Sequence, residues 1–124
     1  MRRYLVGIVL LGLLLAGTLG VWWRMAAVHR PVAEELIRAA EYSRQGDSAA
    51  AVDAARLAKK VWEDHWRFSA AFADHGPMEQ MDDLFCTLEA YDPASADFAA
   101  RCLQLAERSK AIIDDHAFNW WNLL

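Results

Sequence analysis

The chain lacks the sequence patterns that carry most known enzyme chemistry. It has no Gly-rich phosphate-binding loop, no Cys-x-x-Cys pair, no nucleophile elbow and no protease-type motif. No segment alternates apolar and polar residues as a strand of a half-buried sheet does. These absences favour an all-α protein that is not an enzyme and that holds no cofactor.

Charge is absent from one long stretch, residues 4–23, which are 20 residues. A helix of that length spans about 30 Å, the thickness of the hydrocarbon core of a bilayer. Two tryptophans followed by an arginine close the stretch, as is typical of a membrane–water interface. We therefore predict a transmembrane helix over 4–23, preceded by a short basic N-terminus, 1–3. The predicted anchor residues are Tyr4, Trp22, Trp23 and Arg24.

A cleaved secretory signal is the alternative to a retained anchor, because Met1-Arg2-Arg3 resembles the basic start of a signal peptide. The apolar stretch is long for a signal, no good small-x-small cleavage site follows it, and tryptophans occupy its exit. Leu15-Ala16-Gly17-Thr18 has Thr where a lipoprotein signal needs Cys, which excludes lipoprotein processing. We expect a single-pass anchor in the cell membrane.

Charge is divided unevenly along the chain. Residues 1–30 hold four arginines and no acid, so the remainder holds nine bases and all 17 acids, a net charge of −8. An acidic domain argues against nucleic acid as a partner. The expected partners are the lipid bilayer and another envelope or membrane protein. The arginines flanking the span nearly balance, but a short basic N-terminus usually stays in the cytoplasm, so we expect an extracytoplasmic domain.

The rest of the chain is predicted to hold about four helices in a small antiparallel bundle. We expect a juxtamembrane linker at 24–31, the helical bundle at 32–118 and an aromatic and apolar tail at 119–124. Pro31 suits the first turn of a new helix that ends near Arg44.

Turn signals place the other helices. Gly46 suits a left-handed turn, and the second helix runs from Ser48 to about Asp74 with two neighbouring apolar stripes, which predicts a central helix. Gly76-Pro77 predicts a stop and a restart, so the third helix covers 78 to about 91. A fourth helix follows Pro93.

The tail is the first candidate interaction site, through Trp120 and Trp121. Two alternatives stay open for it. The tail folds back to cover the bundle, or it contacts lipid or a partner protein.

Three Asp-His pairs suggest a second candidate, because imidazole and carboxylate groups bind zinc or manganese. Adjacent residues on a helix point about 100° apart, and no two histidines have the i, i+4 spacing, so we do not predict a metal site. His65 lies on an apolar stripe, which favours a hydrogen-bonded core histidine. The weak candidate ligands are His65, His75, Asp82 and His116.

Cys86 and Cys102 lie at equal distances from Ala94 in the turn between the last two helices, so an antiparallel hairpin brings them to one level. An oxidising compartment allows a disulfide between them. The alternative is two buried free thiols, because helix axes usually lie 8–10 Å apart and a disulfide needs closer Cα atoms.

A family resemblance rests on the order of several features. The anchor is followed by Gly46-Asp47 and an Ala-rich helix, then Trp62, Asp74-His75, the acidic Met81-Asp82-Asp83-Leu84 and a final Asn122-Leu123-Leu124. This order resembles the domain-of-unknown-function 4363 family, small single-pass membrane proteins of Gram-positive bacteria with no assigned reaction. The resemblance implies that Trp62, His75 and Asn122 are family marker positions, and we expect them to be structural. The Trp120-Trp121 pair and the Ala-rich composition depart from the family pattern.

Two functions remain open from the sequence. The first is a membrane-anchored helical bundle that serves as a protein-interaction or structural module at the bacterial cell envelope. The alternative is a metal- or ligand-binding sensor or enzyme built on the Asp-His pairs.

Overall fold

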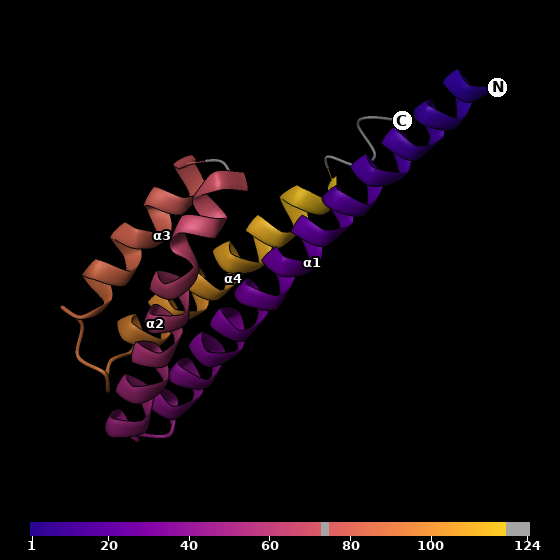
Figure 1. Cartoon of the computed structure of the whole chain (residues 1–124). Coiled ribbons are helices and arrows are strands. Elements are labelled where there is room, and N and C mark those ends of the chain that lie inside the picture. The colour runs from indigo at the N-terminus through magenta and orange to yellow at the C-terminus, as the bar shows by residue number, and fades with distance from the viewer. Residues whose placement is uncertain (73–74, 119–124) are drawn as a thin grey trace.

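The computed structural model describes residues 1–72 and 75–118, with backbone alone for Phe72 and for 115–118. Four helices make up this part of the chain (Figure 1): α1 (Arg2–Arg44), α2 (Ser48–Phe72), α3 (His75–Leu88) and α4 (Ala96–Phe118). No strand occurs among the described residues, so the prediction of an all-α fold is confirmed.

The first helix is continuous where the sequence analysis expected a linker and a new start. Residues 24–31 are helical, and Pro31 lies inside α1. A proline inside a helix removes one backbone hydrogen bond, and here it is exposed, so its ring displaces no core side chain. Met25 and Val28 on one side of it, and Val32 on the other, are all buried. The apolar stripe thus crosses the proline, and packing outweighs the cost of the lost bond.

α1, and not α2, is the central helix. It packs along both α2 and α4, whereas α3 contacts α4 and touches α2 only slightly. Alanines lie buried on both α1 and α2, and their small side chains let the two helices approach closely. The buried alanines of these two helices are Ala26, Ala33, Ala39, Ala40, Ala51, Ala54, Ala55 and Ala58.

Two side-chain hydrogen bonds connect α1 to α4 and to the turn that precedes α4. The Ser43 hydroxyl donates to the Pro93 carbonyl at 2.6 Å, and the Ser109 hydroxyl donates to the His29 carbonyl at 3.0 Å. The two helices therefore run antiparallel, with Ser109 at the level of His29.

The turns follow the predicted chemistry with one exception. Gly46 has φ +81° between α1 and α2, as expected, and the Asp47 carboxylate accepts from the Ala50 backbone N–H at 3.1 Å. The Ser95 hydroxyl accepts from the Phe98 N–H at 3.1 Å at the start of α4. The exception is α3, which begins at His75 and ends at Leu88, so Gly76-Pro77 lies in its first turn.

Candidate functional site

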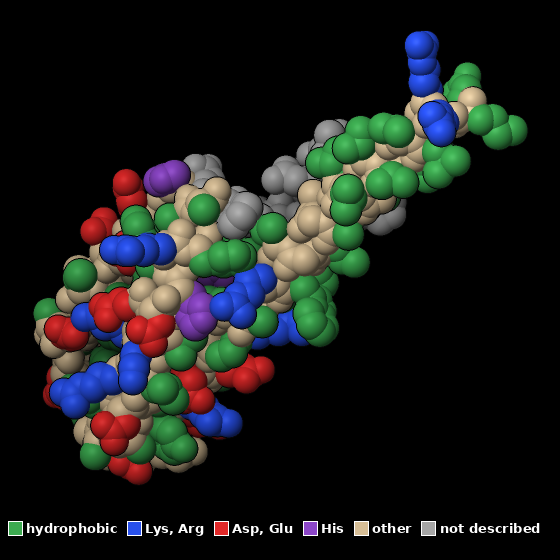
Figure 2. Space-filling view, viewed as in Figure 1, with side chains coloured by type: hydrophobic (Ala, Val, Ile, Leu, Met, Phe, Trp, Pro, Cys, Tyr) green, Lys and Arg blue, Asp and Glu red, His purple; other side chains and the backbone are tan. Residues whose placement is uncertain are grey.

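One end of α1 extends beyond the other described helices (Figure 1). Every residue from Met1 to Gly20 is exposed, and the segment includes twelve large hydrophobic side chains more than two-fifths exposed, among them Leu13 at 66% and Ile8 at 69%. Figure 2 shows hydrophobic side chains gathered on the part of α1 that extends beyond the other helices, while all the acidic side chains in view lie on the larger part of the molecule. α1 is the one helix of the described residues that is long and apolar enough to span a membrane.

The contact between α1 and the other helices begins at the predicted interface. Trp22 is half-buried, Trp23 is 75% exposed, and the Arg24 guanidinium lies 5.7 Å from the centre of the Phe68 ring. Such a cation–π contact at a partly exposed position stabilises by about 0.5–1 kcal/mol. Tyr4, the anchor residue predicted at the opposite end, is 81% exposed.

The far end of α4 reaches the same boundary. Ser109 lies at the level of His29, and α4 continues nine residues further, to Phe118. Because two antiparallel α-helices have the same rise per residue, Phe118 lies near the level of Gly20, about 14 Å beyond Ser109. The bundle therefore ends where the exposed part of α1 begins.

A shared carboxylate joins α2 to α3. Asp82 accepts a hydrogen bond from the Trp62 indole N–H through Oδ1 at 2.6 Å and from the Trp66 indole N–H through Oδ2 at 2.9 Å. Trp62 is 1% exposed and its ring centre lies 5.5 Å from that of His29, whereas Trp66 is 36% exposed. These contacts give Trp62 a structural role. Its ring fills the core, and its indole N–H donates to the Asp82 carboxylate of α3.

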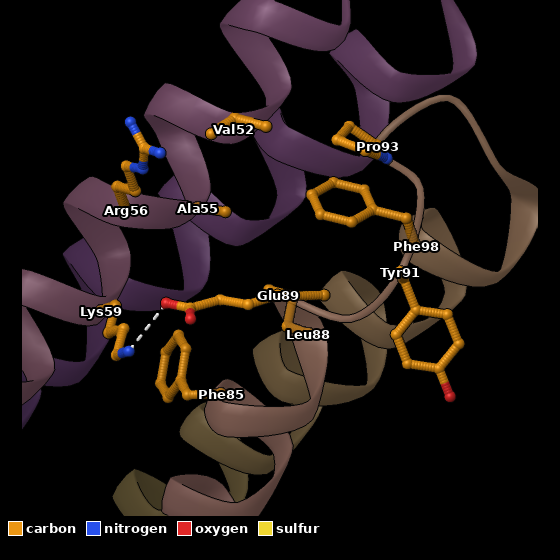
Figure 3. Close-up of a pocket in the computed structure, with 10 residues that line it drawn as sticks. All are labelled: Val52, Ala55, Arg56, Lys59, Phe85, Leu88, Glu89, Tyr91, Pro93 and Phe98. Carbon is orange, nitrogen blue, oxygen red and sulfur yellow. Dashed lines mark hydrogen bonds and ion pairs between the residues drawn. The ribbon is translucent and has the colours of Figure 1, made fainter.

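Between α2 and α3 the helices leave a groove of about 340 Å³ (Figure 3). Phe85 and Leu88 of α3 line one side and Val52 and Ala55 of α2 the other, with Phe98 at one end. The ten residues that define this α2–α3 groove are Val52, Ala55, Arg56, Lys59, Phe85, Leu88, Glu89, Tyr91, Pro93 and Phe98.

An ion pair crosses the groove. Lys59 Nζ lies 2.9 Å from Glu89 Oε1, and the dashed line in Figure 3 shows this contact from α2 to the residue just beyond α3. The hydrogen bond with Glu89 raises the pKa of Lys59, and the same bond lowers the pKa of Glu89. The pairing therefore favours the charged forms of both side chains. Both side chains are partly exposed, so the pair adds little stability.

The weak metal candidates whose side chains are described, His65, His75 and Asp82, form no metal-binding group. Both oxygens of Asp82 accept from indole groups, His65 has its Nδ1 3.0 Å from the Val61 carbonyl oxygen, and His75 is exposed at the start of α3. Among the described side chains, no three from histidine, cysteine, aspartate and glutamate gather where they could hold a metal ion. The side chain of His116 and all of Trp120, Trp121 and Asn122 lie outside the described residues.

The two cysteines are free thiols in different surroundings. Cys86 is exposed and Cys102 is fully buried, so only one of the two buried thiols that the sequence analysis considered is in fact buried. Burial raises the pKa of Cys102 to about 12. Cys102 is thus an apolar core residue at neutral pH, and Cys86 is the accessible thiol of the two.

Sequence reasoning missed a polar cluster at the centre of the bundle. His29 is 0% exposed, and Ser109, also buried, bonds to its carbonyl. The signal was the spacing of Met25, His29, Val32 and Leu36, which continues one helical stripe through the proline. The α2–α3 groove was also missed, because its shape depends on how far α3 lies from α2.

No family model, no curated protein and no solved structure matches this chain. The resemblance to the domain-of-unknown-function 4363 family therefore stays a prediction.

Proposed function

We propose that this chain is a single-pass membrane protein whose first helix is both the anchor and the central helix of an extracytoplasmic interaction domain. The observation that carries the proposal is the continuity of α1. One helix presents an exposed apolar segment up to Gly20 and then enters the core at Met25, which is 0% exposed. Exposed apolar area on this scale marks contact with a membrane or with another protein, and the length matches a bilayer.

The same continuity argues against removal of the segment as a signal peptide. A peptidase cuts just beyond the apolar stretch, which here means within residues 22–28. Met25, Ala26 and Val28 are buried there. A cut at that place deletes or frays the part of α1 against which α2 and α4 pack. Retention of the segment keeps the core intact.

A binding role, and not catalysis, fits the rest of the domain best. Asp82, the one acid among the candidate ligands, already has two donors. The α2–α3 groove combines apolar lining residues with the charged Arg56, Lys59 and Glu89, and contact surfaces between proteins likewise combine apolar and polar groups. No described feature favours the sensor or enzyme alternative. We propose the bacterial cell envelope as the location and a second envelope or membrane protein as the partner.

Carbonate extraction of native membranes tests the anchor. An integral protein stays in the pellet at alkaline pH, and we expect this chain, uncleaved by mass, in that fraction. Recovery of a shortened chain in the supernatant contradicts the proposal.

Labelling of Cys86 tests the orientation without any added residue. A membrane-impermeant maleimide should label Cys86 in intact spheroplasts, because the thiol is exposed in the domain. The matched control is Cys86→Ser, in which only the buried Cys102 remains. Labelling that requires lysis places the domain in the cytoplasm.

Crosslinking in native membranes followed by purification tests the binding role, and the absence of any enriched protein counts against it.

A further inference from the structure

The parts of α1 and α2 next to the exposed apolar segment carry bases and no acid. Residues 21–33 of α1 and 65–72 of α2 include no aspartate or glutamate, although the chain beyond residue 30 holds nine bases and 17 acids, a net charge of −8. The same two stretches hold three exposed arginines, Arg24, Arg30 and Arg67. Figure 2 shows Lys and Arg side chains where the hydrophobic part of α1 joins the larger part of the molecule.

The ion pairs among the described side chains leave these three arginines out. The bases that form those pairs are Arg38, Lys59 and Lys110. The Arg24 guanidinium lies 5.7 Å from the centre of the Phe68 ring, and such a contact uses the face of the guanidinium and not the N–H groups at its edge. Arg24 and Arg67 therefore keep N–H donors for an acceptor from outside the chain.

Arg24 and Arg67 lie at the height of the lipid headgroups. Phe68 lies beside Arg24, and α2 packs antiparallel along α1. By this register Arg67 is nearly level with Arg24, about 6 Å beyond Gly20. The headgroup layer is about 5–7 Å thick on each side of a bilayer, so both arginines reach it when the hydrocarbon core ends near Gly20. Arg30 lies farther out, about 15 Å beyond Gly20.

The acid at this height belongs to another side of the bundle. Asp114 of α4 lies five residues beyond Ser109, which is level with His29, so Asp114 is near the level of Arg24. The helices α2 and α4 each pack along α1 and contact each other little. Charge is thus divided between two sides of α1, and the side that α2 covers is the one that complements a negatively charged surface.

We propose that Arg24 and Arg67 bind the phosphate groups of anionic phospholipids, so that the end of α2 contacts the bilayer that α1 spans. A guanidinium group matches a phosphate with two parallel hydrogen bonds, and cations near an anionic surface are attracted to it. Trp23, 75% exposed, lies next to Arg24, as is typical of a membrane–water interface. The inference rests on the proposed membrane anchor, and it adds a second helix and a class of lipid to the contact.

Native mass spectrometry of the full chain tests the inference. The chain is released from nanodiscs that contain equal amounts of phosphatidylcholine and phosphatidylglycerol, and the lipids that stay bound are counted. One cation near the surface changes the binding of an anionic lipid about fivefold. We therefore expect the ratio of bound phosphatidylglycerol to bound phosphatidylcholine to exceed about 10 for two arginines.

Matched variants assign the preference to the two arginines. Arg67→Gln should lower the ratio about fivefold, and Arg24→Gln combined with Arg67→Gln should bring it close to one. The control combines Arg44→Gln with Arg56→Gln, two exposed arginines that lie more than about 20 Å beyond Gly20 by the same register. This control removes the same charge and should leave the ratio unchanged.

Three outcomes overturn the inference: no preference for phosphatidylglycerol in the unchanged chain, an equal loss of preference in the control, or displacement of the bound lipid by an excess of inorganic phosphate. The last outcome identifies a site for a free anion and not for a lipid. Failure of the broader proposal looks different, because it is seen as release of the chain in carbonate extraction. A chain that stays in the membrane without a preference that depends on Arg67 contradicts this inference alone.

Discussion

Replacement of Asp82 tests the link between α2 and α3 most directly, because one carboxylate serves two indole groups. A carboxylate has two acceptor oxygens, an asparagine side chain has one acceptor and one donor group, and an alanine has neither. The two donors differ in burial: Trp62 is 1% exposed and Trp66 is 36% exposed. Water can therefore replace the acceptor at Trp66 but not at Trp62.

The expected costs follow from that difference. Asp82→Ala leaves the buried Trp62 N–H without a partner, which costs about 1–3 kcal/mol, and the rehydrated Trp66 adds a smaller loss. We expect a total of about 2–3 kcal/mol, which for a domain of this size lowers the melting temperature by about 10–20 °C. Asp82→Asn keeps an oxygen for Trp62 and should cost about 1 kcal/mol.

Thermal unfolding of the full chain in nanodiscs, followed by circular dichroism, measures these costs. Asp83→Ala is the matched control, since Asp83 is the exposed neighbouring acid, and it should change the melting temperature by less than about 3 °C. Combining Asp82→Asn with Trp66→Phe should cost less than the sum of the single changes, because both remove the same bond. If Asp82→Ala melts like Asp83→Ala, the hydrogen bonds do not hold α3 to α2 and the reasoning is wrong.

Three further predictions concern α1 and the thiols. Pro31→Ala restores a backbone hydrogen bond inside a continuous helix and should stabilise the chain by about 1–3 kcal/mol, seen as a higher melting temperature; a lower one contradicts continuity. Leu13→Arg places a charge near the middle of the span at a cost of about 3 kcal/mol and should move the chain into the carbonate supernatant, whereas Leu57→Arg, at an exposed leucine of α2, should not. In the folded chain at pH 8, a maleimide should modify the exposed Cys86 within minutes. Cys102, whose pKa is about 12, should stay unmodified until urea unfolds the domain. Equal rates of modification at the two thiols contradict the burial of Cys102.

Local sequence signals predicted the helices well. Gly46 and Asp47 placed the first turn correctly because a positive φ and a helix cap each depend on one residue. The start of α2 at Ser48 and the end of α1 at Arg44 follow from the same signals and are confirmed. Pro31 misled the prediction because the cost of a proline is local, whereas the burial of Met25, Val28 and Val32 that outweighs it depends on α2 and α4.

Long-range geometry limited the prediction of the candidate site. The pairing of Asp82 with Trp62 and Trp66 depends on which turn of α3 faces α2, and no residue spacing within either helix encodes it. The α2–α3 groove likewise arises from the distance between two helices. The exposed apolar segment was predictable, because its length and its lack of charge are properties of one stretch of sequence.

The unbroken first helix also connects the proposed membrane span directly to the rest of the domain. A span in a bilayer changes its tilt when the bilayer changes thickness, and tilts near 20° are common. From Gly20 to Arg44 the helix continues for 24 residues without a break, about 36 Å of helix. A change of 20° in the span therefore moves the distal end of the domain sideways by about 12 Å, given that length. Because α2 and α4 pack along this same helix, the whole domain follows, and under the proposed anchoring the position of its outer surface depends on the thickness of the membrane.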